Sequence, residues 1–245
     1  MSKGTYQLRR VAGVERSEPP VSRVWGFATL NPADPNLNPS TNRYDMLWAM
    51  RNIVLASRNA KKEDELGTLL TDLPCRVVSL LNYPNCPEVE EDGITFEANS
   101  EKKAREVSEF TGEWALADDS GLVVDTLDGE PGVYSARYGG LETDTERNQY
   151  LLENLAGVEV PDRTARFLCC ATLYGDGRII GQASGVCEGC ILEAPRGSRG
   201  FGYDPIFQAE GYTASMAELS PEEKNRISHR GKAMRQIREF LQQTV

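Results

Sequence analysis

Apolar and polar positions follow a regular pattern only from about residue 50 onward. Residues 53–56 form a short apolar run that ends in polar residues, which is typical of a buried strand. Leucines recur with helical spacing along one side of residues 61–73, so this segment is expected to be a helix. Residues 75–81 are again mostly apolar and indicate a second strand.

Capping residues mark three further helices. Residues 96–111 carry an apolar stripe in a lysine-rich segment and are followed by Gly112, a common C-terminal cap. Thr143 and Glu146 have the spacing of a capping box, which opens a helix that ends near Gly157. Near the end of the chain, residues 220–223 combine an N-cap serine with a proline and a glutamate, and they start a C-terminal helical segment.

The remaining apolar runs indicate strands. Residues 166–174 and 178–187 flank Gly175-Asp176-Gly177, which predicts a β-hairpin. Residues 115–117 form a brief strand that runs into a polar loop at residues 118–121. Strands and helices mixed in this order predict an α/β domain with a mixed sheet.

The first 49 residues contrast with the rest of the chain. They contain several prolines and scattered polar residues without lasting periodicity, so we interpret residues 1–49 as an irregular, disordered N-terminal extension and residues 50–245 as one domain. The alternative is that aromatic residues such as Trp25 and Trp48 dock on that domain.

Composition and charge exclude some classes of protein. The net charge of −10 argues against non-specific binding to nucleic acid, because phosphate backbones attract basic surfaces. We find no run of about 20 apolar residues that could cross a membrane and no signal-peptide pattern. The six cysteines are therefore interpreted as reduced thiols, and the cytoplasm is the expected location.

One candidate site lies between the first strand and the first helix, at Ser57-Arg58-Asn59-Ala60-Lys61-Lys62. The N-terminus of a helix offers unpaired N–H groups and a partial positive charge, which suit phosphate, and two lysines add full charges. The alternative is a solvated first turn with surface lysines. The glycines of a P-loop are absent.

A second candidate consists of two acidic clusters, residues 88–92 and Asp118-Asp119. Mg²⁺ prefers oxygen ligands and is often held by one or two carboxylates together with substrate phosphates. Ordinary acidic surface is the alternative for residues 88–92. It is the weaker alternative for Asp118-Asp119, because adjacent acids between apolar runs are unfavourable without a cation or a donor.

Three other segments carry less specific signals. Residues 201–205 follow a glycine-rich stretch, which allows close backbone approach to a ligand, and an aromatic side chain there can stack on a base. Lys224, His229 and Arg230 lie together in the last helical segment. The pair Cys187 and Cys190 is interpreted as packed thiols and not as a zinc site, because residues three apart on a strand point to opposite faces.

Taken together, these segments closely resemble the inosine triphosphate pyrophosphatase family over roughly residues 52–243. The matching blocks are Ser57-Arg58-Asn59-Ala60-Lys61-Lys62, Glu91-Asp92-Gly93-Ile94-Thr95-Phe96, Leu116-Ala117-Asp118-Asp119-Ser120-Gly121-Leu122, Pro131-Gly132-Val133-Tyr134-Ser135-Ala136-Arg137-Tyr138, Phe201-Gly202-Tyr203-Asp204-Pro205 and Glu223-Lys224-Asn225-Arg226-Ile227-Ser228-His229-Arg230. The resemblance implies an elongated fold with two lobes around a long mixed sheet, an active site in the cleft between the lobes, and a homodimer.

The resemblance also assigns roles by position. Residues 57–62 are expected to bind the triphosphate, Glu91 and Asp119 to ligate Mg²⁺, and Asp119 to accept the proton of the attacking water. Ser120 is expected to contact substrate. The base and sugar are expected to lie against Phe201, Gly202, Tyr203, Asp204, Lys224, His229 and Arg230. The expected reaction is hydrolysis of ITP, dITP or XTP to the monophosphate and pyrophosphate.

Two positions depart from the family pattern, which usually has glycine in place of Arg58 and often glutamate in place of Ala98. Two alternatives therefore stay open at this point. One is a nucleotide-binding homologue that has lost turnover, and the other is a general metal-dependent phosphatase that releases orthophosphate.

Overall fold

A computed structural model of the chain describes residues 51–70 and 75–243. The proposed extension, residues 1–49, lies outside the described residues. So does the end of the helix expected over residues 61–73.

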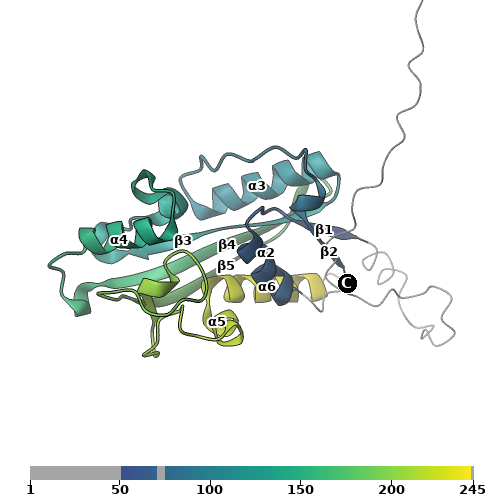
Figure 1. Ribbon diagram of the computed structural model, residues 1–245. Coiled ribbons are helices and arrows are strands. Elements are labelled where there is room, and N and C mark those ends of the chain that lie inside the picture. The colour runs from purple at the N-terminus through teal and green to yellow at the C-terminus, as the bar shows by residue number, and fades with distance from the viewer. Residues whose placement is uncertain (1–50, 71–74, 244–245) are drawn as a thin grey trace, which may run out of the picture.

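A six-stranded mixed sheet runs the length of the described domain (Figure 1). The strand order is β2-β1-β3-β4-β5-β6. The strands are β1 (Asn52–Leu55), β2 (Arg76–Ser79), β3 (Trp114–Val124), β4 (Thr164–Gly175), β5 (Arg178–Ile191) and β6 (Phe207–Ala209). β1 pairs in parallel with β2 and β3, whereas the pairs from β3 to β6 are antiparallel. The predicted α/β class and mixed sheet are confirmed.

Five α-helices and several short 3-10 turns connect the strands. The helices are α2 (Ala60–Leu69), α3 (Phe96–Thr111), α4 (Asp144–Asn154), α5 (Pro221–Ile227) and α6 (His229–Gln243) in the described residues. α3 has the predicted bounds, because Thr95 caps its first turn and Gly112 ends it with a φ of 71°. The predicted strand over residues 75–81 is shorter, since a 3-10 turn (Leu80–Asn82) replaces its end.

Helices cover both faces of the sheet and define two lobes (Figure 1). Near β1 and β2, one core lies under α2 and α6, and a second lies under α3 on the opposite face. A third core, around Leu122, Leu151 and Phe207, fills the other lobe beneath α4 and the loop of residues 197–203. The long strands β3, β4 and β5 run through both lobes, which agrees with the expected elongated shape.

The hairpin of β4 and β5 confirms the strongest turn signal in the sequence. Asp176 and Gly177 join the two strands, and both have a positive φ, 51° and 75°. Two-residue hairpin turns with positive φ at both positions match the twist of the flanking strands.

β3 corrects one sequence prediction, because the acidic segment 118–121 lies inside this strand and not in a loop after it. Asp118 and Asp119 pair with Ala171 and Cys170 of β4. The strand continues because its acids find cationic and amide partners from distant parts of the chain.

Among the described residues, none of the helices has the length and apolar character that a membrane span requires.

Candidate active site

The short length of β1 creates the candidate site. β1 ends opposite Leu116, so among the described strands the rest of β3 pairs only with β4, apart from an isolated bridge between Val123 and Pro131. Polar groups fill this open edge. The carbonyl of Asp118 accepts hydrogen bonds from Lys62 Nζ at 3.1 Å and Lys103 Nζ at 3.4 Å, and the N–H of Leu122 donates to Ser135 Oγ at 2.9 Å.

A cavity of about 220 Å³ lies against this edge, and residues from both lobes line it. Twelve of the residues predicted from the sequence lie on its walls: Asn59, Lys62, Glu91, Asp119, Ser120, Phe201, Gly202, Tyr203, Asp204, Lys224, His229 and Arg230. Four others, Ser57, Arg58, Ala60 and Lys61, are not among its lining residues.

A larger hollow of about 380 Å³ lies near the start of β1 and the β4–β5 turn. Its charged lining residues are Arg51 and the acids Glu109, Glu113 and Asp176. This excess of carboxylates does not suit an anionic ligand, so the smaller cavity is the candidate active site.

The loop before α2 is held by its own side chains. Asn59 Oδ1 accepts hydrogen bonds from the N–H groups of Lys61 and Lys62 and thereby caps the helix. Lys62 then reaches into the protein, where its Nζ lies 2.9 Å from Asp118 Oδ1. Lys61 extends the other way and donates to the Gly200 carbonyl at 3.3 Å.

The two departures from the family pattern lie outside the cavity. The Arg58 guanidinium donates to the Cys86 carbonyl, so its side chain is directed toward the loop around Cys86. Ala98 is exposed in the first turn of α3, where its N–H is bound by Thr95.

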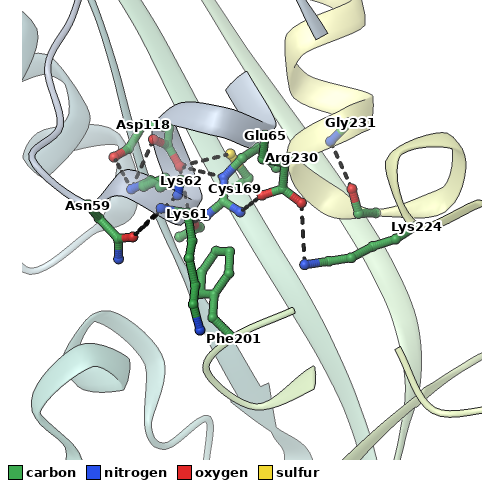
Figure 2. Close-up of polar contacts among 12 residues, drawn as sticks. Asn59, Lys61, Lys62, Glu65, Asp118, Cys169, Phe201, Lys224, Arg230 and Gly231 are labelled. Atoms are coloured by element: carbon green, nitrogen blue, oxygen red, sulfur yellow. Dashed lines mark hydrogen bonds and ion pairs between the residues drawn. The ribbon is translucent and has the colours of Figure 1, made fainter. Parts of the chain in front are cut away.

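Six buried or nearly buried charges form an alternating series that we call the charge chain: Lys62, Asp118, Arg230, Glu65, Lys224 and Asp204. Figure 2 shows the first five of them. Arg230 Nε lies 3.0 Å from Asp118 Oδ2, and its Nη1 contacts Glu65. Lys224 Nζ lies 3.3 Å from Glu65 Oε1 and 2.8 Å from Asp204 Oδ2. Helix α2 thus contributes two members, Lys62 and Glu65, which are three residues apart on one face.

The charge chain favours the ionised form of two of its three acids, Asp118 and Glu65. Burial alone would raise the pKa of Asp118, but Lys62 and Arg230 hold it well below its usual range. Glu65 has a lowered pKa for the same reason, through Arg230 and Lys224. Burial dominates at Asp204 and raises its pKa despite the contact with Lys224. Three basic and three acidic side chains therefore alternate along the charge chain.

A second acidic group lies on the opposite face of β3. Successive residues of a strand point to opposite faces, and Asp119 accordingly faces α3 while Asp118 faces α2 and α6. Asn99 Nδ2 donates to Asp119 Oδ2 at 2.9 Å, and the N–H of Ser120 donates to Oδ1 at 2.9 Å. Burial raises the pKa of Asp119, and the nearby Glu91 carboxylate adds to this effect.

Glu91 and Asp119 bring two carboxylates close together. Such a pair repels itself and suits a divalent cation. Lys103 forms an ion pair with Glu91, and Asp119 is hydrogen-bonded by the neutral amide of Asn99, so one ion-paired lysine faces two carboxylates. Within residues 51–70 and 75–243, no three His, Cys, Asp or Glu side chains form a metal cage. A Mg²⁺ ion held by two carboxylates and completed by phosphate oxygens does not require such a cage.

The loop of residues 197–203, which we call the aromatic loop, forms another wall of the cavity. Gly200 has a φ of 73°, and a Cβ there would lie 2.1 Å from Asp204 Oδ2, so only glycine fits. The same Asp204 oxygen accepts the N–H of Phe201 at 2.8 Å. The Phe201 ring lies over two cations, 4.8 Å from Lys224 Nζ and 5.4 Å from the Arg230 guanidinium carbon.

His229 also lines the cavity. Its ring stacks on Phe167 with a centroid distance of 4.7 Å and an interplanar angle of 14°. The imidazole makes no hydrogen bond with the described residues, and Nδ1 is fully buried. Burial, together with the charge of Arg230, lowers the pKa of His229 well below its usual value, so the ring is neutral.

This neutral histidine predicts a pH dependence of stability. Below about pH 6.5 the unfolded chain gains a proton on His229 that the folded protein does not bind. The free energy of unfolding should therefore fall with decreasing pH, by up to about 1.4 kcal/mol per pH unit from this group. Denaturant titrations between about pH 7 and about pH 5 should show a shallower dependence for His229→Gln. An identical slope in the two proteins would contradict the prediction.

Several residues at the site were missed at the sequence level. These are Glu65 in the charge chain, Asn99 and Lys103 beside the acidic pair, and Asp144, Arg147 and Asn148 near the aromatic loop. All six lie on or beside helices, where polar residues ordinarily face solvent. The helical spacing between Lys62 and Glu65 is the one signal that could have identified a member of this group.

Comparisons with known proteins agree with this geometry. A model of the Ham1 family matches residues 53–240. A dITP/XTP pyrophosphatase from Geobacter sulfurreducens is 49% identical over 193 residues, which cover 78% of this chain and 97% of that protein. A second protein of that name, from Desulforamulus reducens, is 50% identical over 190 residues, covering 77% of this chain and 94% of that protein.

Solved structures show the same fold. A HAM1 protein from Coxiella burnetii superposes with a TM-score of 0.73 at 43% identity, covering 79% of this chain and all of that one. A nucleoside-triphosphatase, dITP/XTP pyrophosphatase from Mycobacterium abscessus gives a TM-score of 0.63 at 41% identity, over 76% of this chain and 98% of that one.

Proposed function

This chain belongs to the Ham1 family, and on that premise we propose that it hydrolyses non-standard purine nucleoside triphosphates such as ITP, dITP and XTP. The products are the nucleoside monophosphate and pyrophosphate. The reaction would remove these nucleotides from the cytoplasmic pool before they enter DNA or RNA.

One observation carries the proposal: an acidic pair and the cations of the charge chain line the same cavity. The triphosphate carries about four negative charges and needs cations along its length. Lys62 from α2 and Lys224 from α5 both line the cavity, and Lys224 lies beside Phe201 of the aromatic loop. A nucleotide laid along the open edge of β3 would place its phosphates near α2 and its base near Phe201.

We assign the metal ligands to Glu91 and Asp119. Bound there, Mg²⁺ would neutralise phosphate charge and polarise the phosphoryl group that water attacks. Asp119 is in addition the proposed proton acceptor for that water, because its oxygens are held in place by Asn99 and Ser120. Lys103 lies close enough to Glu91 to stabilise the phosphate charge that develops during the reaction.

We assign base recognition to the wall formed by Phe201 and His229. Hypoxanthine and xanthine present a carbonyl at C6, where adenine presents an amino group. The neutral imidazole of His229 makes no hydrogen bond within the described residues, so its N–H is available to such a carbonyl. Adenine would leave that donor unpaired, and sites of this kind discriminate strongly.

A substrate panel tests the proposal. The full chain is incubated with Mg²⁺ and ITP, dITP, XTP, GTP or ATP, and both products are identified. We expect monophosphate and pyrophosphate, a preference for ITP and XTP over ATP of about 10²-fold or more, and loss of turnover in EDTA. Release of orthophosphate would indicate a general phosphatase, and nucleotide binding without product would indicate a protein that has lost turnover.

We also propose that residues 50–245 form the functional unit and that this unit is a homodimer. The two bacterial relatives are covered almost completely by about four fifths of this chain, and the family match begins at residue 53. A protein consisting of residues 50–245 should therefore keep the melting temperature, mass in solution and ITP hydrolysis of the full chain. A drop of several degrees, or loss of the dimer, would show that residues 1–49 contribute to the structure.

A further inference from the structure

Helix α4 holds Gly202 of the aromatic loop through both its N–H and its carbonyl. Asp144 Oδ2 accepts the N–H of Gly202 at 2.8 Å, and Asn148 Nδ2 donates to the Gly202 carbonyl at 3.1 Å. The two side chains are four residues apart, which places them one above the other on the same face of α4. We call this pair of contacts the clamp.

Further contacts orient the side chains of Asp144 and Asn148. Thr143 and Glu146 form a capping box that fixes the start of α4, next to Asp144. Arg147 Nη2 lies 2.5 Å from Asp144 Oδ1, which leaves Oδ2 directed to Gly202. Asn148 is buried, and its amide orientation follows from its partner, because a carbonyl oxygen can only accept a hydrogen bond.

The aromatic loop needs such support. Its residues belong to no helix or strand, and Gly200 and Gly202 both have a positive φ. Glycine gives the backbone more freedom than any other residue, so a loop with two of them would move without external contacts. Phe201 lies between these glycines, and its ring forms the wall of the cavity over Lys224 and Arg230.

We propose that Asp144 and Asn148 are positioning residues for base recognition, acting through Phe201. The clamp fixes the two peptide groups on either side of Gly202, the residue after Phe201, and Asp204 fixes the N–H of Phe201 itself. The ring is then held rigidly before substrate arrives, which favours tight and selective binding of the base. The inference rests on the proposed function, because it assigns the base to this wall.

Single substitutions test the clamp by separating binding from turnover. Asn148→Ala and Asp144→Ala should each raise KM for ITP by about 3–10-fold, the effect of one lost hydrogen bond, and reduce the preference for ITP over ATP. The kcat values should stay within about threefold, because Glu91 and Asp119 keep their partners. Asp144→Asn retains an acceptor oxygen for Gly202 and should stay closer to the unaltered protein than Asp144→Ala.

A matched control separates the contacts to Gly202 from effects on the stability of α4. Glu146→Ala breaks the capping box on the same helix without touching Gly202, so it should lower the melting temperature while KM stays unchanged. If Glu146→Ala raises KM as much as Asn148→Ala does, the clamp acts only through helix stability and the proposal is wrong.

A double-mutant cycle tests the route through Phe201. In a Phe201→Ala background, Asn148→Ala should have no further effect on KM, because the ring it positions is gone. Additive effects would overturn the proposal. Calorimetric titration with IMP provides a readout without turnover. Failure of the unaltered protein to release pyrophosphate would refute the proposed function, whereas a lower IMP affinity in Asn148→Ala would still support the clamp.

Discussion

Asp119→Asn is expected to lower kcat for ITP by about 10²–10⁴-fold, the usual effect of losing a general base. The substitution keeps the size of the side chain and removes its charge. It also replaces one carboxylate oxygen by an NH₂ group, which would face a donor from either Asn99 or Ser120. Some loss of stability is therefore expected, and melting temperature must be measured together with kcat.

A metal titration and a control substitution at a neighbouring acid test whether the effect is specific to Asp119. Mn²⁺ binding, followed by calorimetry, should weaken in Asp119→Asn if this residue is a ligand. Asp92→Asn is the matched control, because Asp92 adjoins Glu91 but forms an exposed ion pair with Lys102. We expect that control to keep its turnover. Near-normal turnover of Asp119→Asn at saturating Mg²⁺ would show that the catalytic assignment is wrong.

Arg230→Ala is expected to reduce the free energy of unfolding by about 3–5 kcal/mol, because it breaks two buried ion pairs at once. The guanidinium contacts Asp118 and Glu65, and it donates to Ser120 Oγ at 2.9 Å. Without it, Asp118 keeps Lys62 and Glu65 keeps Lys224 as their cations. Since three of its N–H groups are engaged in this way, we expect turnover of ITP and ATP to fall together.

The measurements are denaturant unfolding and kcat/KM for both nucleotides. Arg235→Ala is a suitable control, because Arg235 lies on the same helix and donates only to the carbonyls of Asn225 and Arg226 at the surface. Arg230→Lys should recover part of the stability, since it restores the charge without the planar guanidinium. A normal unfolding free energy with a loss confined to ITP would instead assign Arg230 to reading the base.

Local signals in the sequence were sufficient where a residue acts on its neighbours. Thr95 and Gly112 bound α3, the capping boxes at Thr143 and Ser220 start α4 and α5, and Asp176-Gly177 forms the hairpin turn. In each case the capping or turn group lies within a few residues of the group it binds. Such contacts depend on spacing alone and can be read from a single chain.

Contacts between distant segments explain what the sequence did not predict. Asp118 and Asp119 interrupt the apolar pattern, so the strand was expected to end there. It continues because Lys62 and Arg230, which are 56 and 112 positions away, stabilise Asp118. Glu65 and Asn148 were missed because a polar helical residue has the same pattern whether it faces solvent or a partner from another element.

The hairpin of β4 and β5 has a consequence for the order of folding. Its strands are adjacent in sequence and joined by two residues, so their pairing closes a very short loop. The parallel pairing of β1 with β3 spans about sixty positions and must form against a larger loss of chain entropy. We expect the β4–β5 hairpin to form early and the pairing of β1 with β3 to form late. The catalytic groups would then come together only in the final stage of folding, so that partly folded chains have no hydrolytic activity.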